Sequence, residues 1–222
     1  MAGPTKLTPR EYLNRARVLD TAVTLADKGG IEALSMRKLA QQLGVVPMAL
    51  YKHVANKEEL LDGMVDVVVG EIDPPAGGTD WKLAVRQRIL SARRALLRHP
   101  WAAQVIESRA APTPAVLAYL DSTIGMFRRG GFSIDLTHHA MHAMGSRLLG
   151  FSQELFDDTG GVGPETDPEA LRAMAGAYLN ITALVAAITH DQGSMVGLGC
   201  DDQFEFEFAL DLMLDGLGRL RT

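Results

Sequence analysis

Apolar residues recur at every third or fourth position along almost the whole chain, and the strict alternation typical of strands is absent. This spacing is that of helices that bury one face. We therefore predict an all-α fold. The stretches expected to be helical are 9–28, 36–43, 47–54, 57–72, 80–98, 100–107, 113–129, 134–157, 168–190 and 202–219.

Capping residues set the expected ends of the first four helices. Thr8, followed by a proline, fits the N-cap of the first helix, and Ser35 fits the N-cap of the second. Gly44 fits the position just after a helix, where glycine adopts left-handed backbone most easily. Asn56 and Glu59 have the spacing of a capping box at the start of the fourth helix.

The third helix is too short to build much core, and its two faces differ in character. Leu50 and Val54 are expected to point inward, because they lie four residues apart on one face. The opposite face carries Met48, Ala49, Tyr51 and Lys52. Small or apolar groups and hydrogen-bond donors are what a helix needs in the DNA major groove. Two helices joined by a glycine-containing turn therefore predict a helix-turn-helix.

The distribution of charge and a segment rich in proline and glycine divide the chain into two parts. Residues 1–60 hold nine Lys and Arg against six Asp and Glu, an excess of three in a chain whose net charge is −5, which leaves −8 for the rest. The segment "DPPAGGTD" at 73–80 cannot lie inside a helix. We predict a DNA-binding domain at 1–72, with its core at about 9–56 and the fourth helix as connector, and a second domain at 73–222.

The segment "IEALSMRKLAQQLGVVPMALYKHVANKEELLDGMV" at 31–65 resembles the DNA-binding head of the TetR family of transcriptional regulators. The helix with "RKLAQQLGV", the helix with "LYKHV" and the helix start "NKEELL" stand in the family's register. "RHPW" at 98–101 and "FEFALDLMLDGL" at 206–217 resemble the body of the tetracycline-repressor branch. The resemblance implies a three-helix head on a larger helical body that binds a ligand and dimerises.

The resemblance also implies which residues contact operator DNA. Arg37, Tyr51, His53 and Lys57 would hold phosphates, which positions the head without reading sequence. Pro47, Met48, Ala49 and Lys52 would approach base edges. Because the stretch from Val46 to Met48 lacks the polar residue usual there in the family, we expect apolar contact and groove shape to dominate the reading.

By the same resemblance, the protein is a homodimeric repressor that binds a palindromic double-stranded DNA operator and is released by a small, largely apolar molecule. The expected interface residues are on the last helix: Phe204, Phe208, Leu212 and Met213. The expected pocket residues are Trp101, Tyr119, Met126, Phe127, Met141, His142, Met144, Arg147 and Phe151. Each of these apolar side chains could instead belong to ordinary core, because helical core has the same spacing.

A metal site is a second interpretation of "DLTHHAMHAMGSR" at 135–147. His138 and His142 lie four residues apart, which is metal-ligand spacing on a helix. Tetracycline repressors place a metal-coordinating histidine where this chain has Ser146, and Glu154 is the only match to an acidic residue of that site. We therefore predict no metal and no cofactor, and leave interface or pocket hydrogen bonding open for the two histidines.

Other function classes find less support. Cys200, the only cysteine, has no group nearby in sequence that would activate a thiol, so we do not expect an enzyme. The chain lacks a secretion signal and an apolar run of membrane-spanning length, so we expect a cytoplasmic protein with no membrane partner. The alternative function is a helical adaptor that uses its helix-turn-helix for protein contact.

Overall fold

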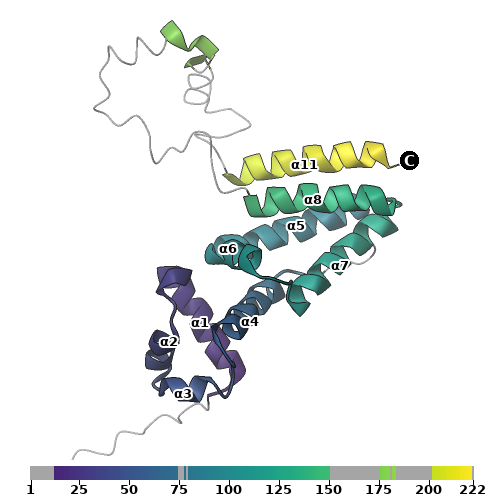
Figure 1. Cartoon of the computed structure of the whole chain (residues 1–222). Coiled ribbons are helices and arrows are strands. Elements are labelled where there is room, and N and C mark those ends of the chain that lie inside the picture. The colour runs from purple at the N-terminus through teal and green to yellow at the C-terminus, as the bar shows by residue number, and fades with distance from the viewer. Residues whose placement is uncertain are drawn as a thin grey trace, which may run out of the picture. The chain divides into compact units, whose positions relative to one another are not determined.

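The computed structural model describes residues 13–74, 78, 80–150, 176–180, 182–183 and 202–221, and these residues form helices without any strand. The all-α prediction is confirmed (Figure 1). The elements are α1 (Arg15–Gly29), the 3₁₀ turn η1 (Ile31–Ala33), α2 (Met36–Leu43), α3 (Pro47–Leu50), α4 (Lys57–Gly70), α5 (Trp81–Arg98), α6 (Trp101–Ser108), α7 (Pro114–Arg129), α8 (Ile134–Gly150) and α11 (Asp202–Leu220). Among the described helices, none is both long and apolar enough to cross a membrane.

The chain divides into two compact units, each with its own buried apolar cluster. The first comprises Met1–Gly77 and Ser91–Gly125, and the second comprises Gly78–Leu90 and Met126–Thr222. The first unit thus contains α1 to α4, α6, the end of α5 and most of α7. The second contains the start of α5, the end of α7, α8 and α11.

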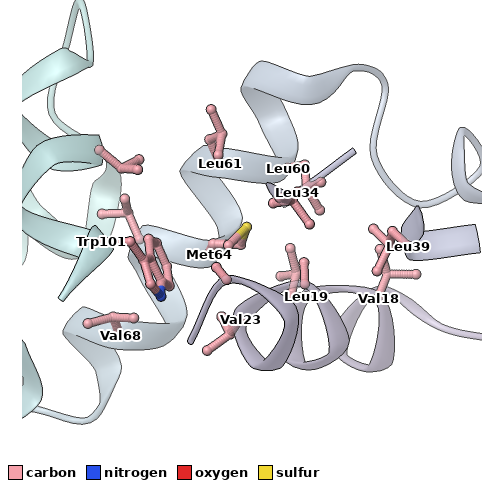
Figure 2. Packing of buried hydrophobic residues seen from close by; sticks show 14 of the residues in the cluster. Val18, Leu19, Val23, Leu34, Leu39, Leu60, Leu61, Met64, Val68 and Trp101 are labelled. Atoms are coloured by element: carbon pink, nitrogen blue, oxygen red, sulfur yellow. The ribbon is translucent and has the colours of Figure 1, made fainter. Parts of the chain in front are cut away.

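The core of the first unit is formed where α1 packs against α2 and α4. Figure 2 shows Val18 and Leu19 of α1 facing Leu39 and the buried side chains of α4. Trp101 of α6 lies beside Val68 of α4 in the same cluster. This packing holds α1, α2 and α4 as one three-helix body.

Polar contacts join the C-terminal ends of α1 and α4 to the junction of α5 and α6. Trp101 donates its Nε1–H to Asp27 Oδ1 at 2.7 Å, and His99 Nδ1 lies 2.8 Å from the same oxygen. The other ring nitrogen of His99 lies 3.1 Å from Glu71 Oε1, and Arg98 Nε donates to Glu71 Oε2 at 3.0 Å. His99 is buried, so these contacts replace the water that its imidazole would otherwise bind.

The predicted caps of α2 and α4 are confirmed. Ser35 Oγ accepts from the Lys38 amide at 3.2 Å, and Gly44 follows α2 with a φ of 68°. Asn56 Oδ1 accepts from the Glu59 amide at 2.8 Å. Each cap satisfies an amide that the helix itself leaves without a partner.

The expected start of α1 was wrong. Asn14 has extended backbone and its Oδ1 accepts from the Arg17 amide at 2.8 Å, so the helix begins at Arg15. Thr8 lies outside the described residues. The amide oxygen of Asn14 supplies the same capping chemistry that was expected of the Thr8 hydroxyl.

The second unit is built around aromatic side chains. Phe127, Phe132 and Phe206 are fully buried, and the rings of Trp81 and Phe132 lie 4.6 Å apart edge to face. α8 and α11 pack side by side (Figure 1). Arg86 ties α5 to α11, with Nε donating to Asp211 at 2.7 Å and Nη2 donating to Glu207 at 2.6 Å.

Candidate nucleic-acid interface

The turn between α2 and α3 has the geometry of a helix-turn-helix. Gly44 takes left-handed backbone, which a residue with a side chain adopts at a cost. The Val45 amide donates to Ala40 O at 3.0 Å, which closes the turn onto α2. Val46 is extended, as expected before a proline, and Pro47 opens α3. The sequence therefore fixes both the end of one helix and the direction of the next.

Two buried side chains anchor the short third helix. Leu50 and Val54 have exposed fractions of 0% and 1%, and both belong to the core of the first unit. On the other face, Met48 is 72% exposed and Tyr51 is 46% exposed. Lys52 is also exposed. The predicted division into an inward and an outward face is confirmed, and the outward face mixes apolar surface with a phenol and a cation.

The third helix is shorter than predicted. α3 ends at Leu50 instead of about Val54, and Tyr51 to His53 form a turn closed by the His53 and Val54 amides on Leu50 O, at 2.8 and 3.0 Å. The next segment is already committed to α4, because the Ala55 amide donates to Glu59 Oε2 at 2.7 Å. Tyr51, Lys52 and His53 therefore project from the end of the helix and not along its side.

The cationic side chains expected at phosphates are exposed. Arg37 stands in the first turn of α2, Lys52 follows α3, and Lys57 is the first residue of α4. Within the described part of the chain, none of the three has an ion-pair partner. Their charges are therefore available to an external anion.

The acidic side chains near these cations are engaged elsewhere. Arg109 Nη1 donates to Glu58 Oε2 at 2.6 Å, and Arg15 lies 3.6 Å from Glu59. Burial lowers the pKa of Arg109, but the hydrogen bond and charge of Glu58 together with Asp62 raise it further, and the pKa lies above its ordinary value. Drawing Glu58 toward Arg109 reduces the repulsion that a phosphate would meet at the start of α4.

Val46 and Lys38, which were not among the residues predicted to contact DNA, also belong to this surface. Val46 is 68% exposed beside Met48, and Lys38 is exposed next to Arg37 at the start of α2. Val46 precedes the helix, so a helical-face argument does not reach it. Lys38 could have been found from its place in the first turn of a capped helix. Of the other predicted residues, Pro47 is exposed and Ala49 and His53 are half-buried.

The residues predicted to line a ligand pocket fall into both compact units. Trp101 belongs to the core of the first unit, where Tyr119 is half-buried. In the second unit Met126, Phe127 and Met144 are buried together, and Met141 packs against them. Their role in ligand binding stays a prediction.

The remaining pocket candidates lie in different surroundings. Arg147 donates to the Glu205 carbonyl at 2.7 Å, and its guanidinium lies 5.1 Å from the Phe206 ring centroid. His142 is exposed on α8. Phe151, together with Glu154 and Cys200, lies outside the described residues. Arg147 therefore links α8 to α11, whatever else it contacts.

Three of the four predicted interface residues, Phe204, Phe208 and Leu212, lie along one edge of α11. Phe208 and Leu212 are 53% and 58% exposed, and Phe204 stacks on Phe208 with ring centroids 6.3 Å apart. Met213 is half-buried and packs against the core of the second unit. Phe206, Leu210 and Leu214 are buried on the other side of the helix. α11 is therefore apolar on two sides, only one of which faces its own core.

The histidines of α8 form a pair and not a larger cluster of metal-binding side chains. Among the described residues, no group of three or more His, Cys, Asp or Glu side chains is placed to hold one ion. His138 and His142 do lie together, with ring centroids 4.6 Å apart, on the exposed side of α8.

A helix-turn-helix with an anchored short helix, an apolar outward face and unpaired cations at two helix starts defines a DNA-binding class of protein. Comparison with known proteins supports this class. Residues 18–64 match the family model described as bacterial regulatory proteins, tetR family, and residues 74–221 match the tetracyclin repressor-like C-terminal domain.

Individual relatives extend over most of the chain. The transcriptional repressor DrrR1 of Streptomyces coeruleorubidus is 31% identical over 224 residues, covering 94% of this chain and 78% of that protein. The structure of a possible TetR family regulator from Streptomyces coelicolor A3(2) has a TM-score of 0.71 and 31% identity, covering 94% of this chain and all (100%) of that one. ActR of Streptomyces coelicolor, in complex with (S)-DNPA, has a TM-score of 0.69 and 27% identity, covering 95% and 100%.

The chain belongs to the TetR family and is a DNA-binding regulator of transcription.

Proposed function

We propose that the protein is a homodimeric repressor that binds a palindromic operator and is released by a small, largely apolar effector. The outward face of α3 carries this proposal. Met48 on α3 and Tyr51 and Lys52 in the turn after it are exposed, and Leu50 and Val54 hold this segment in the core. Such a helix gains nothing from exposed apolar surface unless a partner covers it.

The chemistry of α3 suggests how the operator is read. The segment 46–54, "VPMALYKHV", contains no Arg, Asn, Gln, Asp or Glu. Bidentate recognition of guanine by Arg, or of adenine by Asn or Gln, is therefore unavailable from this segment. The operator can still be read by apolar contact of Val46 and Met48 with thymine methyl groups. Lys52 lies nearby and can donate a hydrogen bond to a base. Arg37, Tyr51, His53 and Lys57 hold the flanking phosphates.

The functional division proposed is a DNA-binding part at 1–72 and an effector-binding and dimerising part at 73–222. The match of 74–221 to a tetracyclin repressor-like C-terminal domain supports this division. The solved ActR structure is a complex with (S)-DNPA, which supports a small organic effector here as well. Met141, beside the buried Met144 and Phe127, offers an adaptable apolar lining in the second unit.

Dimerisation is proposed to use the exposed edge of α11 together with α8. Phe208 and Leu212 stand out from the helix, and α8 packs alongside it. Two copies related by a two-fold axis present two α3 helices to successive major grooves of a palindrome. This arrangement requires no catalytic chemistry and no cofactor. The proposed site of action is operator DNA in the cytoplasm.

The experiment that tests the proposal is selection of bound duplexes from a randomised pool by the purified full-length protein, followed by sequencing. We expect enrichment of an inverted repeat whose half-sites are about one helical turn apart, or a multiple of that. Light scattering of the complex should give two protomers per duplex.

A lack of enrichment at low and moderate salt would contradict the repressor proposal. The adaptor alternative then gains support if Lys52→Ala and Met48→Ala, on the exposed surface of the helix-turn-helix, weaken the binding of a protein partner. Enrichment of a single half-site by a monomer would keep DNA binding and overturn the dimer.

A further inference from the structure

Three of the chain's six histidines stand on the first half of α8, and two of them face each other. The rings of His138 and His142 are 4.6 Å apart between centroids and meet edge to face at 73°. Both side chains are exposed, so neither ring is held by the core. The ring of His139 lies farther from His138, at 5.6 Å between centroids, and its Nε2 is 3.8 Å from Asp135 Oδ1.

Two neutral imidazoles in successive helical turns can share one transition-metal ion. Zinc binds histidine nitrogen at about 2.0–2.1 Å, so tetrahedral ligand nitrogens stand about 3.3 Å apart. Rings with centroids at 4.6 Å reach this separation by side-chain rotation alone, because both are free to turn in solvent. Imidazole ligands favour copper, zinc and nickel over magnesium or calcium.

Two ligands leave such a site incomplete, since a closed zinc site has four. No third His, Cys, Asp or Glu stands within reach among the described residues. The same unit exposes Ile134 on α8 and Phe208 and Leu212 on α11, the helix packed beside it. A second copy lying on this face under two-fold symmetry would bring its own α8 toward the first.

We propose that His138 and His142 form half of an intersubunit site for a divalent transition-metal ion, and that the same two residues of a second copy complete it. This inference rests on the proposed dimer. One ion held by four imidazoles from two chains stabilises the dimer relative to the monomer, because only the dimer binds the ion with the full ligand set.

The test is isothermal titration calorimetry of zinc into the full-length protein, which carries no polyhistidine tag. The titration is run at about pH 7.5, where ordinary imidazoles are neutral. The variants are made in a Cys200→Ser background, which removes the chain's only thiol as a competing ligand. We expect half an equivalent of zinc per protomer. Sedimentation should show the dimer dissociation constant falling by about tenfold or more when zinc replaces EDTA.

His138→Ala and His142→Ala should each abolish the stoichiometric binding and the tightening of the dimer. His139→Ala is the matched control, because it removes a neighbouring exposed histidine that faces Asp135. That variant should bind zinc and dimerise like its parent.

The outcomes separate the alternatives. One equivalent of zinc per protomer without any effect on the dimer would overturn the shared site, and no binding would overturn the site altogether. Loss of zinc binding in His139→Ala, with His138→Ala unaffected, would also contradict it. DNA selection by zinc-free protein tests the repressor proposal separately, so failure of one does not imply failure of the other.

Discussion

Gly63 of α4 packs against the side chain of Leu19 of α1. A Cβ atom built on Gly63 would lie 2.6 Å from Leu19 Cδ2, and Leu19 is itself buried. Glycine at this position therefore lets the two helices approach. A larger side chain at position 63 would hold α1 and α4 apart and lower the packing density of the body formed by α1, α2 and α4.

Gly63→Ala is expected to destabilise the protein. Overpacking costs about 1–3 kcal/mol, which exceeds the ~1 kcal/mol that alanine gains over glycine in a helix. Gly70→Ala is the control, since nothing lies within 4 Å of a Cβ at that position of the same helix. Urea unfolding followed by circular dichroism measures both. Equal changes in the two variants would contradict the close-contact explanation.

The Glu71 carboxylate predicts acid sensitivity in the first unit. Burial alone raises the pKa of Glu71, but hydrogen bonds from Arg98 and His99 outweigh it, and the pKa lies below its ordinary value. A depressed pKa in the folded state contributes stability above the unfolded pKa, and this stability is lost as pH falls through the folded pKa. Stability should therefore decline below about pH 4.5.

Glu71→Gln should flatten that decline, because the amide does not titrate. Glu107→Gln is the matched control in the same unit, since Glu107 is exposed and has no ion-pair partner among the described residues. Urea unfolding at a series of pH values tests this prediction. A decline of equal steepness in Glu71→Gln and in the unsubstituted protein would show that Glu71 is not its source.

Phosphate contact by Lys57 predicts a change in salt dependence. Lys57→Ala should weaken binding to all duplexes about equally and reduce the slope of log affinity against log salt by about 0.9. Lys28→Ala, at the end of α1 that contacts α6 through Asp27, removes an equal charge and should leave the slope unchanged. Fluorescence anisotropy at four or more salt concentrations measures the slopes. An unchanged slope for Lys57→Ala would remove this residue from the interface.

Exposed Met48 predicts that thymine methyl groups carry operator specificity. Replacing thymine by uracil deletes only the methyl, and each lost contact should cost about 0.8 kcal/mol, or roughly fourfold in affinity. Met48→Ala should bind thymine and uracil operators alike at the positions that Met48 contacts. If the unsubstituted protein binds both operators equally, its specificity comes from groove shape or from Lys52.

The exposed edge of α11 predicts how the dimer can be broken. Phe208→Glu or Leu212→Glu would bury a charge in the proposed interface, so the variants should be monomers at concentrations where the parent is a dimer. Leu117→Glu on α7 changes a comparably exposed leucine and should remain dimeric. Light scattering distinguishes the monomer from the dimer by mass. Dimeric Phe208→Glu and Leu212→Glu would place the interface elsewhere.

Local chemistry made much of the head predictable from sequence. Ser35, Gly44 and Asn56 act through groups within a few residues, and each was placed correctly. The inward direction of Leu50 and Val54 follows from helical periodicity alone. The start of α1 was predicted less well, because Thr8 was expected as its N-cap and Asn14 caps it instead.

Contacts between distant segments could not be predicted in the same way. His99 meets Asp27 across 72 residues, and Arg86 meets Asp211 across 125. No periodicity links such positions, because their proximity depends on how the helices pack. The early end of α3, by contrast, lies beside a local contact, because the Ala55 amide donates to Glu59 Oε2 in the cap of α4.

The chain's two tryptophans, Trp81 and Trp101, lie one in each compact unit. Trp101 stands among the side chains of α1 and α4, whereas Trp81 meets Phe132 edge to face. Each unit therefore carries its own intrinsic fluorophore. Trp81→Phe leaves emission from the DNA-binding side alone, and Trp101→Phe leaves emission from the side with α8 and α11. Melting or quenching of the two halves can thus be followed by optical spectroscopy without an added label.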